Sequence, residues 1–162
     1  IIFDELVTQP RPALAHARVV GTLSSALANP FDRGLNGPGG WLILFEPEVR
    51  FGPHVLVPDL AGWRRTTMPE IPLVARTDVA PDWVCEVLSP GTEARDRNEK
   101  KLIYAANAVA FMWLVDVENH AIEAYTNERG TWREVGVFRG DEDAHIAPFD
   151  AVALPMAWLW AR

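Results

Sequence analysis

Cysteine, lysine and long apolar runs are all scarce in this chain. A single cysteine, Cys85, in 162 residues excludes a disulfide framework and a cysteine-based zinc site. No run approaches the roughly 18 apolar residues of a membrane span, and the first residues lack the charged and then apolar segments of a signal peptide. We therefore expect a cytoplasmic protein that does not enter a membrane.

Basic residues are also outnumbered. The 15 Lys and Arg residues against 22 Asp and Glu residues give a formal net charge of −7. Such a surface disfavours tight, sequence-independent binding of nucleic acid, which depends on neutralising phosphates. The two lysines are neighbours, Lys100 and Lys101, and every other basic residue is arginine. Chance explains this placement as readily as chemistry does, so its meaning depends on the surrounding residues.

The rest of the composition is typical of one folded domain. With 49% hydrophobic residues the chain can bury a full core, and no repeat or linker divides it, so we expect one domain over residues 1–162. Periodicity and turn signals predict helices over 14–29, 97–106 and 154–160, and a loop over 64–81. Strands are predicted over 41–45, 48–51, 54–57, 83–88, 111–115, 121–126 and 132–138. This order predicts an α/β (α+β) fold, with a mixed β-sheet flanked by helices.

One carboxylate interrupts the apolar strand predicted over 83–88. Alternation places Glu86 on the same face as Val84 and Leu88, in or near the interior. Asp59 ends another apolar run, and if the two strands are neighbours, both carboxylates point at one spot. Because no cluster of Cys or His residues accompanies them, such a site would favour Mg²⁺ or Mn²⁺ over zinc.

A hydrolytic metal site also needs a group that orients water or offsets the charge on phosphate. Asp96 is predicted to be the N-cap of the second helix, with Lys100 and Tyr104 on the same helix face. Lys100 can therefore point back toward Glu86, whereas Lys101 is expected to lie in solvent. The alternative is that Lys100 makes an ordinary surface pair with Asp96, and that the carboxylates serve a structural ion pair.

Two weaker candidates remain near this spot. His16 lies on the apolar face of the first helix and could reach the site, although a buried structural histidine is the commoner case. Glu46 follows an apolar strand and is a candidate for a further acidic ligand. The tryptophans, including Trp83 and Trp113 in predicted core strands, favour buried anchors or an oligomer interface over base stacking.

The chain resembles the Uma-two family, bacterial proteins of the PD-(D/E)XK nuclease superfamily described as restriction endonucleases. The resemblance covers residues 12–160 and is carried by four segments: Pro58-Asp59, the run PDWVCEVLSP from Pro81 to Pro90, Asp96-Arg97 with Lys100 and Tyr104, and Trp113-Leu114-Val115-Asp116. It implies a restriction-endonuclease-like core, with Asp59 and Glu86 as metal carboxylates and Lys100 as the active-site lysine. It also implies Mg²⁺ or Mn²⁺ as cofactor, DNA as substrate and a homodimer.

Two positions depart from the usual pattern. The superfamily motif has lysine two residues after the glutamate, where this chain has Leu88, and a lysine on the following helix is a familiar variation in the family. Relatives have glycine directly before Val109, where this chain has Asn107-Ala108. We expect Asn107 to supply the left-handed turn that ends the helix.

The resulting hypothesis is a Mg²⁺-dependent endonuclease that hydrolyses phosphodiester bonds of DNA. Two locally basic segments, residues 95–101 and Arg64-Arg65, are expected to flank the site and to offset the overall charge of −7. The alternative from another functional class is a non-catalytic accessory module that binds nucleic acid or protein and retains the nuclease fold.

Overall fold

The computed structural model describes residues 13–161, so residues 1–12 and 162 of the expected single domain lie outside it. Its centre is a six-stranded sheet in the order β1-β4-β6-β7-β8-β9. The strands are β1 (Trp41–Phe45), β4 (Leu60–Arg64), β6 (Trp83–Leu88), β7 (Phe111–Asp116), β8 (Ala121–Glu128) and β9 (Thr131–Arg139). β6 and β7 are parallel and the other neighbours are antiparallel, so the predicted mixed sheet is confirmed.

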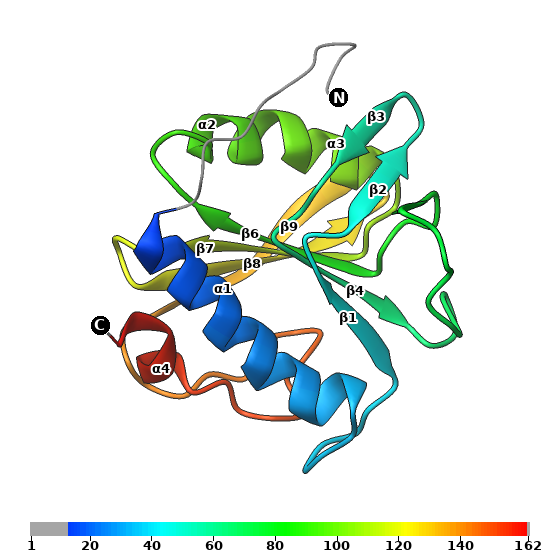
Figure 1. Cartoon of the computed structure of the whole chain (residues 1–162). Coiled ribbons are helices and arrows are strands. Elements are labelled where there is room, and N and C mark those ends of the chain that lie inside the picture. The colour runs from blue at the N-terminus through cyan, green and yellow to red at the C-terminus, as the bar shows by residue number, and fades with distance from the viewer. Residues whose placement is uncertain (1–12, 162) are drawn as a thin grey trace.

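Helices cover both faces of this sheet (Figure 1). One face carries α1 (Leu14–Leu27), which continues as the π-helical turn η1 (Ala28–Asp32), and the short α4 (Met156–Trp160). The other carries one helical segment made of α2 (Glu93–Arg95), η2 (Asp96–Lys100) and α3 (Lys101–Ala106). A second, smaller sheet lies beside this helical segment (Figure 1). Its strand order is β3-β2-β5, with β3 (His54–Leu56), β2 (Glu48–Phe51) and β5 (Arg76–Thr77). No helix within residues 13–161 is long and apolar enough to cross a membrane.

β6 lies at the centre of the core. Every one of its residues is buried, as expected for a strand whose two faces are both covered. Cys85 and Val87 pack into the cluster under α1, whereas Val84 and Leu88 pack toward α3, so the predicted alternation is confirmed. The rings of Trp83 and Trp113 meet edge to face with centroids 5.2 Å apart, which makes both of them core anchors.

The sequence interpretation missed β4. Asp59 does not end a strand that neighbours β6, because β3 pairs with β2 in the small sheet. It directly precedes β4, and β4 pairs with β6. The glycine in this strand, Gly62, has a packing role, since a Cβ atom there would lie 3.2 Å from the Trp83 ring and 3.3 Å from the Trp41 ring. Glycine and flanking proline had obscured the strand pattern.

Three further local predictions were wrong. The second helical segment begins at Glu93, and Asp96 lies within it in right-handed helical conformation, so Asp96 is not its N-cap. At the end of that segment the left-handed residue is Ala108, with φ 59°, and Asn107 keeps φ −104°. The stretch expected to be a loop, residues 64–81, contains β5, which pairs in parallel with β2.

Candidate active site

β4 brings Asp59 beside the centre of β6. Leu60 is the partner of Cys85 in the antiparallel ladder, so the preceding residue, Asp59, lies next to Glu86 and Val87. The carboxylate of Asp59 accepts a hydrogen bond of 2.7 Å from the backbone N–H of Val87 through Oδ2. The side chain of Asp59 is 18% exposed, so this carboxylate remains within reach of solvent.

Glu86 is buried and engaged by the helical segment that follows β6. Its Oε2 accepts a hydrogen bond of 2.9 Å from Lys100 Nζ, and its Oε1 accepts one of 2.5 Å from the hydroxyl of Tyr104. Lys100 Nζ also lies 2.8 Å from Asp96 Oδ1. Glu86, Lys100 and Asp96 are each at most 3% exposed, so Lys100 and Asp96 do not form the ordinary surface pair of the alternative interpretation.

The spacing of this helical segment explains the convergence. Asp96, Lys100 and Tyr104 recur every fourth residue and face β6 together. A buried ammonium needs compensating charge, and here two carboxylates supply it. Asp96, which the sequence analysis had predicted to be a helix cap, is therefore part of this cluster.

Carboxylates outnumber lysines in this cluster, since Glu86 and Asp96 both contact the one ammonium and Asp59 adds a third carboxylate near Glu86. Burial raises the pKa of Glu86 to about 8; the Lys100 charge opposes this, and Asp96 and Asp59 add to it. Burial lowers the pKa of Lys100, but Glu86 and Asp96 raise it by more, so its net pKa lies above the ordinary value. Lys100 therefore stays protonated, and the crowding of carboxylates is relieved at Glu86, which keeps a proton up to a pH of about 8 when no metal is bound.

His16 reaches the same cluster from α1. Its Nε2 lies 3.4 Å from Asp59 Oδ2, and its side chain is 12% exposed. Its Nδ1 is buried and has no hydrogen-bond partner among residues 13–161. Burial lowers the pKa of His16, but the hydrogen bond and charge of Asp59 raise it by more. Glu46 contributes differently, because its side chain is exposed and its backbone N–H donates to the carbonyl of Asp59 at 3.1 Å.

Arg97 fastens the helical segment to the sheet. Its guanidinium binds both carboxylate oxygens of Glu123 on β8 at 2.7 and 2.8 Å, and it also binds Glu93 at 2.7 Å. Tyr125 donates to Glu123 at 2.6 Å, and Lys101 Nζ lies 3.5 Å from the centre of the Tyr125 ring. Lys101 is thus half-buried over an aromatic ring and not free in solvent. No motif indicated Glu123, since it follows Arg97 by 26 residues and lies on another strand.

Arg64 and Arg65, which were expected to flank the site, contact other residues instead. Arg64 ends β4, about 16 Å along the strand from Asp59, and stacks on Trp41. Arg65 pairs with Asp32 at 3.3 Å. The expectation that this pair of arginines offsets charge beside Asp59 was therefore wrong.

The donor set suits a hard divalent cation. No group of three or more His, Cys, Asp or Glu residues within 13–161 is arranged to hold a metal. Mg²⁺, however, needs only one or two protein carboxylates, with water completing the shell. Asp59 and Glu86 would supply such a pair, because each of the engaged Glu86 oxygens retains a second lone pair. A divalent cation would also neutralise the excess negative charge of the cluster.

Comparisons with known proteins agree with this architecture. A crystal structure described as a "putative nuclease belonging to DUF820" from Anabaena variabilis superposes with a TM-score of 0.79 at 21% identity, covering 98% of this chain and 87% of that one. No match was found among curated proteins. Residues 1–157 match the family Uma2, whose description is "Putative restriction endonuclease". On the strength of this match over nearly its whole length, the chain belongs to the Uma2 family.

Proposed function

We propose that this protein is a metal-dependent endonuclease that hydrolyses phosphodiester bonds of DNA. Asp59 and Glu86 hold Mg²⁺ or Mn²⁺, and Lys100 is the catalytic cation. The observation that carries the proposal is the buried ammonium of Lys100, 2.9 Å from Glu86, the carboxylate that lies next to Asp59 across the β4–β6 ladder, in a chain with one other lysine. The family match supports nuclease chemistry, and we propose two such sites in a homodimer, one for each strand.

The residues have separate tasks in this proposal. When bound, the cation polarises the phosphoryl oxygen and lowers the pKa of its water. Lys100, kept protonated by Asp96, offsets charge that develops on the phosphate. Tyr104 fixes the rotamer of Glu86 through its hydrogen bond. His16 and Glu46 border Asp59, and we propose His16 as the nearer candidate for an additional ligand or proton acceptor.

One observation favours a second candidate, a non-catalytic accessory module. Both oxygens of Glu86 already have protein partners, so the same cluster could serve only to stabilise the core. In that case the surface, not this cluster, would carry the binding function, toward nucleic acid or protein. The two candidates differ in whether the cluster binds a divalent cation.

Calorimetric titration with Mn²⁺ and cleavage of supercoiled plasmid test the proposal together. Asp59→Asn is the most informative variant, because this side chain is partly exposed and the amide keeps an oxygen that accepts from Val87. We expect it to lose Mn²⁺ binding and cleavage while unfolding at the wild-type denaturant concentration. Glu86→Gln tests the second carboxylate in the same way.

A matched control removes a carboxylate far from the cluster. Glu128→Gln breaks an exposed pair with Arg133 in the turn region between β8 and β9, so it should bind Mn²⁺ and cleave as the wild type does. Lys100→Arg keeps a positive charge and should retain the fold while reducing cleavage strongly. Full cleavage by Asp59→Asn, or no Mn²⁺ binding by the wild type at millimolar levels, would favour the accessory module.

A further inference from the structure

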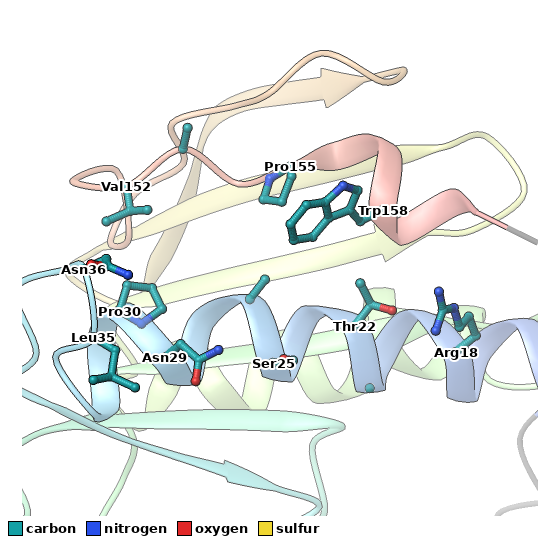
Figure 2. Close-up of a pocket in the computed structure, with 13 residues that line it drawn as sticks. Arg18, Thr22, Ser25, Asn29, Pro30, Leu35, Asn36, Val152, Pro155 and Trp158 are labelled. Carbon is teal, nitrogen blue, oxygen red and sulfur yellow. The ribbon is translucent and has the colours of Figure 1, made fainter.

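A groove separate from the carboxylate cluster runs between α1 and the C-terminal segment (Figure 2). It has a volume of about 550 Å³, within the usual range for ligand sites. One wall is polar and comes from α1 and its continuation, where Arg18, Thr22, Ser25 and Asn29 follow one another by about a helical turn. The opposite wall carries Val152, Pro155 and Trp158.

Trp158 is unusual among the tryptophans of the chain. It is 63% exposed, whereas five of the other six are buried and the sixth, Trp132, is partly buried. Its indole projects from α4 over the groove and faces α1 near Thr22 (Figure 2). An exposed indole above a polar wall offers a stacking surface for a flat ring, with hydrogen-bonding groups beside it.

The charge of the groove differs from that of the whole protein. Acidic residues exceed basic ones by seven in the chain, yet no carboxylate is among the described residues that line this groove. Arg18 lines it, is exposed, and makes no ion pair within residues 13–161. Arg18 also lines a second hollow of about 460 Å³, formed with His120 and Trp160, whose described lining likewise lacks a carboxylate. Arg18, which has no ion-pair partner among the described residues, thus lines both hollows.

We infer that this groove binds a short stretch of single-stranded DNA, with Arg18 on a phosphate and Trp158 stacked on a base. Proteins bind unpaired strands in cationic grooves that carry aromatic side chains for base stacking. This groove has a cation, Arg18, and an exposed aromatic side chain, Trp158. Thr22, Ser25 and Asn29 provide uncharged hydrogen-bonding groups that do not repel phosphate. The choice of DNA rests on the proposed nuclease function, and the groove would hold an unpaired strand away from the carboxylate cluster.

Fluorescence anisotropy with a labelled oligothymidylate of about ten nucleotides, in EDTA and low salt, tests this inference. Removing the metal separates strand binding from cleavage, so Asp59→Asn should bind as the wild type does. Trp158→Ala should weaken binding roughly tenfold, and Trp158→Phe should restore most of it. Arg18→Ala should weaken binding and reduce the slope of log K against log salt by about 0.7.

Arg129→Asn is the matched control for Arg18→Ala. Arg129 is exposed in the turn between β8 and β9 and makes no ion pair within the described residues, and asparagine tolerates its φ of 56°. Its loss changes the net charge equally, so binding should stay at the wild-type level. Wild-type affinity in both Trp158→Ala and Arg18→Ala would overturn the inference, as would duplex DNA binding as tightly as the single strand. No binding by the wild type would also overturn it and would make a peptide the better occupant.

Discussion

Lys100 and Glu86 meet in the core 2.9 Å apart, and Lys100 is at the same time 2.8 Å from Asp96. A buried ammonium between two carboxylates is stabilising only while all three groups are present. The arrangement therefore links the fold to the proposed chemistry, because the same lysine neutralises the core and contacts Glu86, one of the two carboxylates that we propose as metal ligands.

Lys100→Met should destabilise the protein by about 3 kcal/mol, because it leaves two buried carboxylates without a cation. Urea denaturation at neutral pH measures the loss. The neighbouring lysine is the control: Lys101→Met gives up a contact with the Tyr125 ring and should cost about 0.5 to 1 kcal/mol. Equal effects of the two substitutions would contradict the difference in burial between these lysines.

The stability of the metal-free protein should fall as pH rises from about 5 to 8. The pKa of Glu86 is raised from its ordinary 4.5 to about 8, so within this range the folded state binds more protons than the unfolded state. Stability conferred by the protonated carboxyl is complete below 4.5 and is lost as pH rises through 8. The total change should be a few kcal/mol. His16, whose pKa is also raised, acts in the same direction.

Denaturant unfolding across this pH range checks the assignment when Glu86→Gln is compared with the wild type. Because glutamine cannot titrate, the free energy of unfolding of Glu86→Gln should depend less on pH than that of the wild type. The double variant Glu86→Gln/His16→Asn should show a still smaller dependence. A Glu86→Gln profile parallel to the wild-type profile would mean that another group carries the dependence.

Tyr104→Phe should cost about 1 to 3 kcal/mol, because it removes the donor to a buried carboxylate oxygen and leaves the ring packing intact. It should also raise the pKa of Glu86 further, since the hydroxyl lowers that pKa. Chemical denaturation measures the first effect, and the ¹³C shift of the Glu86 carboxyl followed against pH measures the second. Tyr125→Phe removes the hydroxyl that donates to Glu123 and should leave the Glu86 titration unchanged.

Arg97→Ala should loosen the helical segment that carries Lys100, because it removes the bidentate attachment to Glu123 and the bond to Glu93. We expect a loss of about 1 to 2 kcal/mol and faster amide exchange over residues 93–104. Arg133→Ala breaks an exposed pair with Glu128 and should cost less than about 0.5 kcal/mol. Unchanged exchange in Arg97→Ala would show that packing alone holds the segment.

How far the sequence predicted the site can be judged residue by residue. Alternation along one strand was enough to bury Glu86, and helical spacing was enough to aim Lys100 and Tyr104 at it. The route of Asp59 to the same place was not predictable, because β4 contains Gly62, whose packing role depends on Trp41 and Trp83 from two other strands.

The roles of Asp96 and Glu123 depend on tertiary contacts that the local sequence does not indicate. Asp96 has the residue type and position of an N-cap, yet its ion pair with buried Lys100 requires it inside the helix. Glu123 gave no signal, since its importance comes from a contact across 26 residues. Local patterns therefore predicted which side chains are buried, and only the assembled sheet revealed which of them meet.

The helix end that follows Tyr104 makes a separate prediction about backbone strain. Ala108 has φ 59°, a left-handed conformation that disfavours side chains with a Cβ atom and that glycine adopts without strain. Ala108→Gly should therefore stabilise the protein by about 0.5 to 1 kcal/mol, even after the greater freedom of glycine in the unfolded chain is counted. Ala106→Gly, an exposed position in the last turn of α3, should destabilise it by a similar amount. Urea denaturation of the two variants should give changes of opposite sign, and a loss of stability in both would mean that the left-handed turn is not strained.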